Sequence, residues 1–217
     1  MAAGLVLLGI VPAIGGASRL AEIAGGAPMT PDNARFLFMP VPAVVHLLAV
    51  IPYSLLGAFQ FVPTLRRRGS RWHRRSGRAL VGLGFVSALT GLWMTLVYPW
   101  PAGDGEALYV IRLVVGTGMT GALVLGVAAI VRRDFTTHGE WMMRAYALGM
   151  GAGTQVLTHL PWFILVGGWP GEVPRAVMMG GGWAINAIVA EWLIQRGRRR
   201  AGRRHLRSLA QRPQRAA

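Results

Sequence analysis

The sequence contains no cysteine and no lysine, and only 8 of its 217 residues are acidic. Without cysteine there can be no disulfide, thiolate metal site, iron–sulfur cluster or haem attached through sulfur. The scarcity of acids argues against sites built from clustered carboxylates, such as two-metal centres. Nucleotide-binding P-loop, HExxH and GxSxG motifs are also missing. The sequence therefore indicates no catalytic residue, and it favours a protein that is not an enzyme while leaving that question open.

Apolar residues dominate what is present. Charged residues make up 14% of the chain, against about 25% in a typical soluble domain, and the mean hydropathy is +0.43. The apolar residues fall in blocks of the length that a membrane span needs, about 20 residues. We therefore predict an all-α, polytopic transmembrane bundle formed by residues 1–195 as a single domain. The six expected spans are about 4–24, 41–62, 79–98, 108–131, 141–166 and 175–194.

The arginines predict how the bundle is oriented. Of the 23 arginines, 19 lie in a basic loop at 66–78, around the loop at 132–140, or in a basic tail at 196–217 that we expect to be mobile. The positive-inside rule places these segments in the cytoplasm, across a bacterial inner membrane. Six spans put the N-terminus in the cytoplasm as well. Five spans, with the first one cleaved or peripheral, would put it outside.

The basic composition also bears on partners. A pI of about 11.9 would favour nucleic-acid binding in a soluble protein. Here the arginines adjoin apolar spans, so we expect contacts with anionic lipid headgroups and none with nucleic acid. A protein partner or a second copy of the chain stays open.

Two polar stripes are expected inside the bundle, because polar groups within a bilayer face a protein interior or a cavity. Helical spacing aligns each set on one face, and a hypothesis to test is that the two faces meet. The first stripe is His46, Tyr53, Gly57 and Gln60, and the second is Arg144, Gly151, Gln155, His159 and Trp162.

The histidines fall at two levels. His46 and His159 lie at similar predicted depth in the outer leaflet, and His73 and His138 lie just before spans on the cytoplasmic side. Two-haem b cytochromes arrange axial histidines in this way, so haem b is one interpretation and quinone binding is another. The simpler interpretation is that the first pair makes interhelical hydrogen bonds and the second is interfacial. The sequence leaves the cofactor and any metal undetermined.

Two motifs on the cytoplasmic side each place a histidine shortly before an arginine. WHRRSGR contains His73 and Arg78, and HGEWMMRAYAL contains His138 and Arg144. Arginine there could bind an anionic substrate or a haem propionate. Interfacial anchoring, with Trp72 and Trp141 as belt residues, explains the same residues more simply.

These two motifs and HLLAVIPYSLLGAFQF resemble a family of bacterial polytopic membrane proteins catalogued only as domain of unknown function 2306. The similarity covers roughly 41–163. It implies a multi-helix membrane domain and no established activity, and His159, although it lies within this range, is not among the positions that can be carried over from the family. The matching positions are His46, Gly57, Gln60, Phe61, His73, Gly77, Arg78, His138, Trp141, Met142, Arg144 and Leu148.

Three functions remain in competition. The favoured one is a membrane module that binds a cofactor or small ligand and serves electron transfer. The second is a small transporter whose path is lined by the polar stripes, which requires a cavity between the second and fifth spans. The third is a non-catalytic scaffold or assembly factor. The ligand-contacting residues expected for the first are His46, His73, His138, His159, Gln60, Gln155, Arg78 and Arg144.

Overall fold

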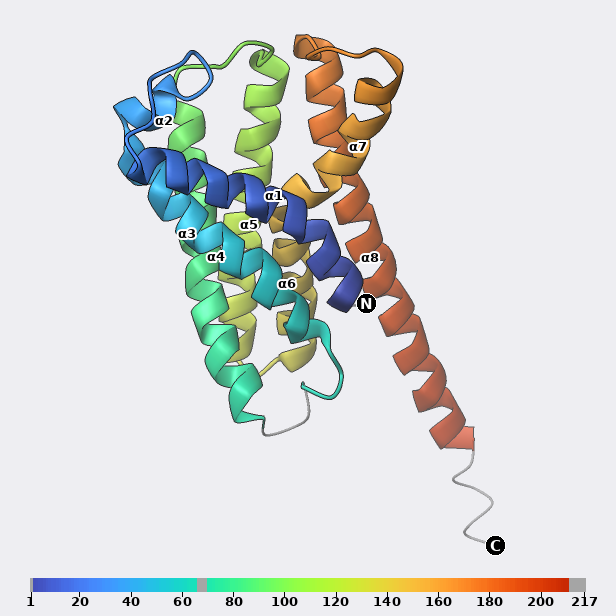
Figure 1. Cartoon of the computed structure of the whole chain (residues 1–217). Helices are drawn as coiled ribbons and strands as arrows, with labels where there is room; N and C mark the ends of the chain where they lie inside the picture. The colour runs from blue at the N-terminus through green and yellow to red at the C-terminus, as the bar shows by residue number, and fades with distance from the viewer. Residues whose placement is uncertain (1, 66–69, 211–217) are drawn as a thin grey trace, which may run out of the picture.

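A computed structural model shows a bundle of α-helices (Figure 1) and describes residues 2–65 and 70–210. No strand occurs among those residues, which confirms the predicted all-α class. The helices are α1 (Ala2–Ala24), α2 (Ala34–Phe38), α3 (Pro40–Gly57), α4 (Arg71–Val97), α5 (Glu106–Val131), α6 (Phe135–Gly149), α7 (Gly151–Leu165) and α8 (Glu172–Ala210). A short 3₁₀ helix, η1 (Ala58–Phe61), extends α3.

Five segments within the described ranges are long and apolar enough to cross a membrane: Ala2–Ala24, Pro40–Phe61, Arg71–Val97, Glu106–Val131 and Glu172–Arg203. They coincide with five of the six predicted spans. The fifth predicted span is divided between α6 and α7, which have 15 residues each. In Figure 1, α1 and α3 slant side by side across the bundle, whereas α4, α5 and the first part of α8 run more nearly parallel to one another.

The basic segment 66–78 was expected to be a loop, and for most of its length this is wrong. Residues 71–78 form the first two turns of α4, and residues 66–69 lie outside the described ranges. The helix can begin early because the Ser70 hydroxyl accepts a hydrogen bond from the His73 backbone N–H at 3.3 Å, which caps the first turn. Arginine also has a high helix propensity.

The 132–140 loop is shorter than expected for the same reason. Asp134 caps α6 by accepting a hydrogen bond from the Thr137 backbone N–H at 3.0 Å, so residues 135–140 are helical. Hydrogen bonds from the Thr137 hydroxyl and backbone N–H hold the pKa of the exposed Asp134 carboxyl below its ordinary value. The capped turn leaves only three residues between α5 and α6.

The predicted fifth span breaks at Met150, between two glycines. The side chain of Asn186 on α8 donates to the carbonyl of Ala147 at 3.1 Å and accepts from the Thr154 hydroxyl at 2.7 Å. It therefore joins both sides of the break. A carbonyl freed inside a membrane bundle needs such a partner, because lipid offers none.

The remaining connections also differ in detail from the expectation. The expected loop at 25–40 contains α2, and α8 continues through the first part of the predicted tail to Ala210. Residues 211–217 lie outside the described ranges. The connection 132–134, residues 62–65 after η1 and the C-terminal half of α8 lie at one end of the bundle (Figure 1), which we call the basic end. The connections 98–105 and 166–171, with α2, lie at the other, which we call the Asp104 end.

Candidate functional site

The predicted site residues do not form one site. His46 is on α3, Gln60 is on η1, and Gln155 and His159 are on α7. Of the remaining four, His73 and Arg78 lie in the first turns of α4, His138 lies in the first turn of α6, and Arg144 lies in the second half of α6. These residues make their contacts at separate places in the bundle.

His46 binds α4. Its Nδ1 lies 3.0 Å from the Ser87 carbonyl oxygen and 3.0 Å from the Thr90 hydroxyl. A carbonyl only accepts, and the Thr90 hydroxyl already donates to the Val86 carbonyl at 2.6 Å, so both require Nδ1 to carry the proton. The lone pair of the neutral ring is then on Nε2, the nitrogen that remains for a ligand.

The second predicted stripe faces α8 rather than α3. The Gln155 amide donates to the Met179 carbonyl at 3.2 Å, and Gly151 packs directly against the Trp183 indole. His159 bonds through Nδ1 to the Gln155 carbonyl of its own helix at 2.7 Å and stacks on Phe163. The hypothesis that the two stripes meet is therefore wrong. The break at Met150 places α7 against α8, so His159 and His46 make their hydrogen bonds to different helices.

Gln60 belongs to a third contact. Its amide donates to the Ser76 hydroxyl at 2.8 Å, and Ser76 donates to the Trp72 carbonyl at 2.6 Å. This chain fixes η1 against the first turns of α4. Gln60 therefore attaches the C-terminal end of α3 to α4, and its hydrogen bond is not made to Gln155.

Two of the histidines and arginines that the cytoplasmic motifs contain, His138 and Arg144, bond to neighbouring helices. His138 Nδ1 bonds to the Gly126 carbonyl on α5 at 2.9 Å, and Arg144 forms a two-pronged ion pair with Glu191 of α8 while lying over the Trp141 ring. Arg78 is exposed and bonds to the Arg74 carbonyl of its own helix at 3.3 Å. The expected anion site at Arg144 is thus occupied by a carboxylate of the chain itself.

A cavity of about 360 Å³ lies between α1, α3 and the helix break. His46 and Ser54 of α3 line it, as do Met150 at the break and three residues of the Asp104 end, Arg19, Arg35 and Phe36. Its volume lies within the range of small-molecule sites, and most of its wall is apolar. We call it the His46 cavity.

Glycines allow the helices around this cavity to approach. A Cβ on Gly16 of α1 would lie 3.0 Å from Leu47, and one on Gly153 of α7 would lie 2.5 Å from the Leu8 carbonyl. Helix α1 therefore rests on α3 near one end and on α7 near the other. The cavity is the space left between these two close contacts.

At the Asp104 end, one buried carboxylate gathers two arginines from different helices. The Asp104 side chain is 2% exposed and forms ion pairs with Arg112 of α5 and, at 2.8 Å, with Arg175 of α8. The turn that carries it needs glycine, since Gly103 has a φ of +79° and any Cβ would lie 2.9 Å from the Pro170 carbonyl. Asp104 thereby ties the α4–α5 connection to α8.

Arg19 and Arg35 lie beside this cluster and share one aromatic ring. Their guanidinium carbons are 4.8 Å and 4.5 Å from the centroid of Phe36, so the two charges are near neighbours. Arg19 also pairs with Glu22 at 2.5 Å. Burial, the largest effect, lowers the pKa of Arg35, the Asp104 carboxylate raises it, and the neighbouring arginines lower it.

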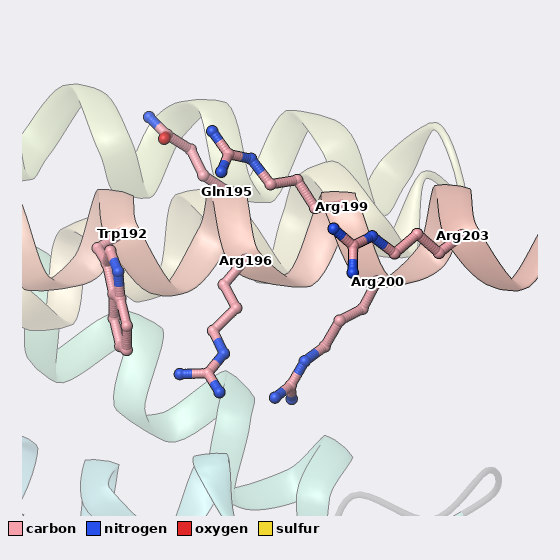
Figure 2. Close-up of a pocket in the computed structure, with 6 residues that line it drawn as sticks. All are labelled: Trp192, Gln195, Arg196, Arg199, Arg200 and Arg203. Atoms are coloured by element: carbon pink, nitrogen blue, oxygen red, sulfur yellow. The ribbon is translucent and has the colours of Figure 1, made fainter.

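A second hollow, of about 440 Å³, runs along the exposed C-terminal half of α8. Figure 2 shows Arg196 and Arg200 projecting from one side of the helix and Arg199 from another, with Trp192 at one end. Arg196 lies 5.1 Å from the Trp192 ring centroid. The hollow is lined by Trp192, Gln195, Arg196, Arg199, Arg200 and Arg203.

Comparison with known proteins bears on the core of this bundle. The family model described as "Predicted membrane protein (DUF2306)" matches residues 43–194, which is more than half of the chain. The chain belongs to the DUF2306 family. No curated protein and no solved structure matches it. The match confirms the predicted family and includes α3 to α7 and most of α8.

Sequence reasoning missed the arginines of this DUF2306 protein that line the cavity. The four arginines outside the three basic segments are Arg19, Arg35, Arg112 and Arg175, and their spacing in the sequence does not indicate that they converge near Asp104 and Phe36. The one available signal was Asp104 itself, a lone acid between two glycines. Within residues 2–65 and 70–210, no three His, Asp or Glu side chains lie close enough together to hold a metal ion.

Proposed function

We propose that this DUF2306 protein binds a small amphipathic molecule from the bilayer in the His46 cavity. The supporting observation is the wall itself, which combines one histidine, two arginines at one end and an apolar body. Such a combination is typical of ligand sites, in which a few polar groups orient a molecule held mainly by apolar contacts.

His46 adds a specific interaction. Because its Nδ1 proton is bound by α4, its Nε2 can accept a hydrogen bond from a hydroxyl or bind a metal. A quinone reduced to its hydroxyl form offers such a donor. Haem held between His46 and His159 fits less well, because His159 does not line the cavity.

The test uses the full chain in nanodiscs of neutral lipid, titrated with a short-tailed quinone analogue held in its reduced, hydroxyl form. Replacing His46 by Leu should weaken binding at least tenfold, whereas the matched change His159→Leu should leave it unchanged. Equal affinity in both variants would refute the role of His46. An absorbance spectrum of the protein from its native membrane tests haem separately, since a Soret band would establish that cofactor.

Transport is a second candidate, because a broken helix lines the cavity. Gly149, Met150 and Gly153 contribute to the wall, and transporters commonly form midplane sites from discontinuous helices. Tyr146 packs with its ring centroid 5.8 Å from that of Tyr53 and 5.1 Å from that of Phe61, and a transported molecule would have to pass this aromatic cluster to reach the basic end.

The cysteine-free chain makes transport testable. A single Ser54→Cys change places a thiol in the cavity wall. A transporter that opens alternately should let membrane-impermeant reagents reach this thiol from either side of oriented vesicles. Labelling from one side alone would exclude alternating access and leave the binding function intact.

We also propose that the basic end faces the cytoplasm and that α8 lies against anionic headgroups there. Arg196, Arg199, Arg200 and Arg203 are exposed on this helix, and each basic residue near an anionic surface contributes about 1 kcal/mol. In vesicles containing phosphatidylserine, changing Arg199, Arg200 and Arg203 to Gln should reduce bound anionic lipid in a salt-sensitive way. Unchanged lipid binding would refute the contact.

A further inference from the structure

The charges at the Asp104 end do not balance. Asp104 is shared by Arg112 and Arg175, and Glu22 pairs with Arg19. Among the described residues, no carboxylate forms an ion pair with Arg35. Of the two guanidinium groups that line the His46 cavity, the one on Arg35 therefore has no ion pair with a carboxylate in the part of the chain that the structure describes.

Arg35 also has an unsatisfied donor. Its Nε is buried and has no hydrogen-bond acceptor among the described residues. A buried donor left unpaired costs about 1–3 kcal/mol, and more when it is charged. The aromatic contact with Phe36 orients the guanidinium but supplies no acceptor. An acceptor brought by a ligand would remove this cost.

The planar guanidinium group restricts what that acceptor can be. It presents parallel N–H groups that match the two oxygens of a carboxylate or phosphate. Arg19, beside the same ring, adds a second positive charge at the same end of the cavity. A neutral carbonyl would satisfy one hydrogen bond but would leave the Arg35 charge without a carboxylate or phosphate partner, whereas Arg19 already pairs with Glu22.

Below the arginines, the cavity wall is apolar. Pro12 of α1, Leu47, Val50 and Ile51 of α3, and Met94 of α4 line it on the way to Met150. An aliphatic chain can occupy such a wall with no polar group left unpaired, and each buried CH₂ contributes about 0.8 kcal/mol. A cavity that is positively charged at one end and apolar along the rest matches a ligand with an anionic head group and an apolar body.

We infer that the His46 cavity binds an anionic amphiphile, with its carboxylate or phosphate on Arg35 and Arg19 and its aliphatic chain extending toward Met150. This inference rests on the proposed ligand-binding function and names the class of ligand. The head group can come from a free fatty acid or from a lipid phosphate, since both present the same pair of oxygens.

The experiment compares three probes on the full chain in neutral-lipid nanodiscs. The probes are palmitate, a palmitoyl lysophosphatidate and the uncharged monopalmitoylglycerol. We expect at least one of the anionic probes to bind ten times more tightly than the neutral one. The Arg35→Gln variant should lose that preference, Arg35→Lys should retain part of it, and Arg78→Gln, at the exposed start of α4, should keep it whole.

The outcomes separate the two proposals. Preference for palmitate assigns a carboxylate, and preference for lysophosphatidate assigns a phosphate. Equal binding of charged and neutral probes would overturn the charge assignment and leave the ligand-binding function standing. If none of these probes and no quinone analogue binds, the proposed function itself fails. Should Arg35→Gln not fold, the anionic and neutral probes on the unaltered protein still decide the matter.

Discussion

Arginine is used differently at the two ends of the bundle. At the basic end most of the arginines project from the surface of α4 and α8, as Arg198 does with 63% of its side chain exposed. At the Asp104 end Arg112 and Arg175 are only 25% and 20% exposed and share one buried acid. Among the described residues, the arginines that follow one another closely in the sequence are thus exposed, whereas four arginines that are scattered in the sequence lie together, partly buried, at the Asp104 end.

The two halves of α3, one toward each end of the bundle, also differ in how tightly they are packed. Toward the basic end, Gly57 lies directly against the Tyr146 ring, and Gly149 of α6 lies 2.6 Å from Tyr53 at its Cβ position. Toward the Asp104 end, the helix borders the His46 cavity. The tight half leaves no room for a ligand, and the open half is where the unpaired charge lies.

The difference between the two ends can be tested by removing one acidic side chain from each. Asp104→Asn leaves two partly buried arginines without their partner, and we expect it to lower the free energy of unfolding by about 3–5 kcal/mol. Glu140→Gln removes the partner of the exposed Arg198 and should cost about 1 kcal/mol or less. Chemical unfolding in detergent measures both, and equal losses would refute the difference.

The packing of α3 can be tested with one methyl group. Gly57→Ala places a Cβ inside the van der Waals contact of the Tyr146 ring, and overpacking of this kind costs up to about 3 kcal/mol. The control Gly82→Ala on α4 adds a Cβ with no atom within 4 Å and should be neutral or slightly stabilising. If Gly57→Ala were also neutral, the close contact would not be a property of the protein in solution.

The helix break between the two halves has its own test. Asn186→Leu removes the donor to the Ala147 carbonyl and the acceptor for Thr154, and we expect a loss of about 1–2 kcal/mol. Hydrogen exchange should rise near 147–154. Thr117→Val is the control, because the Thr117 hydroxyl bonds only within α5. A rise in exchange over the whole chain would show general unfolding and contradict a local role.

The smallest effect concerns the Asp134 cap at the basic end. Since the pKa of this carboxyl is lower in the folded protein, its ionised form stabilises α6 at pH values above the ordinary pKa of 3.8. That contribution should be lost as the pH falls below this value toward the folded pKa. Thermal unfolding of Asp134→Asn should lack this part of the pH dependence, and an unchanged profile would exclude the cap as its source.

The helices themselves could be predicted because apolar runs of about 20 residues have few alternatives in a membrane. The break at Met150 could not, because only glycines mark it and glycine in a membrane helix more often serves close packing. The early starts of α4 and α6 were readable in Ser70 and Asp134, which are favoured capping residues. That the expected ligand residues would lie at separate places could not be predicted, because helical spacing defines a face but not the helix that it meets.

The cavity was beyond sequence reasoning for a different reason. Its charged residues come from α1 and α2, and its histidine from α3, and nothing in their spacing brings them together. The packing of α1 alongside α3 brings these residues to one cavity. His46 alone could be singled out, as a polar group within an apolar run.

Arg19, Arg35 and Phe36 all precede residue 43, where the family match begins, whereas His46, Ser54 and Met150 lie inside it. The cavity therefore has one wall from the shared family domain and one from the N-terminal segment before it. If the inferred ligand binds there, Arg19 and Arg35 of the N-terminal segment would contact its head group, and the shared wall, together with Pro12 of α1, would contact its apolar body. A chimera that carries the first 42 residues of another family member would then acquire that member's head-group preference while keeping the same apolar site.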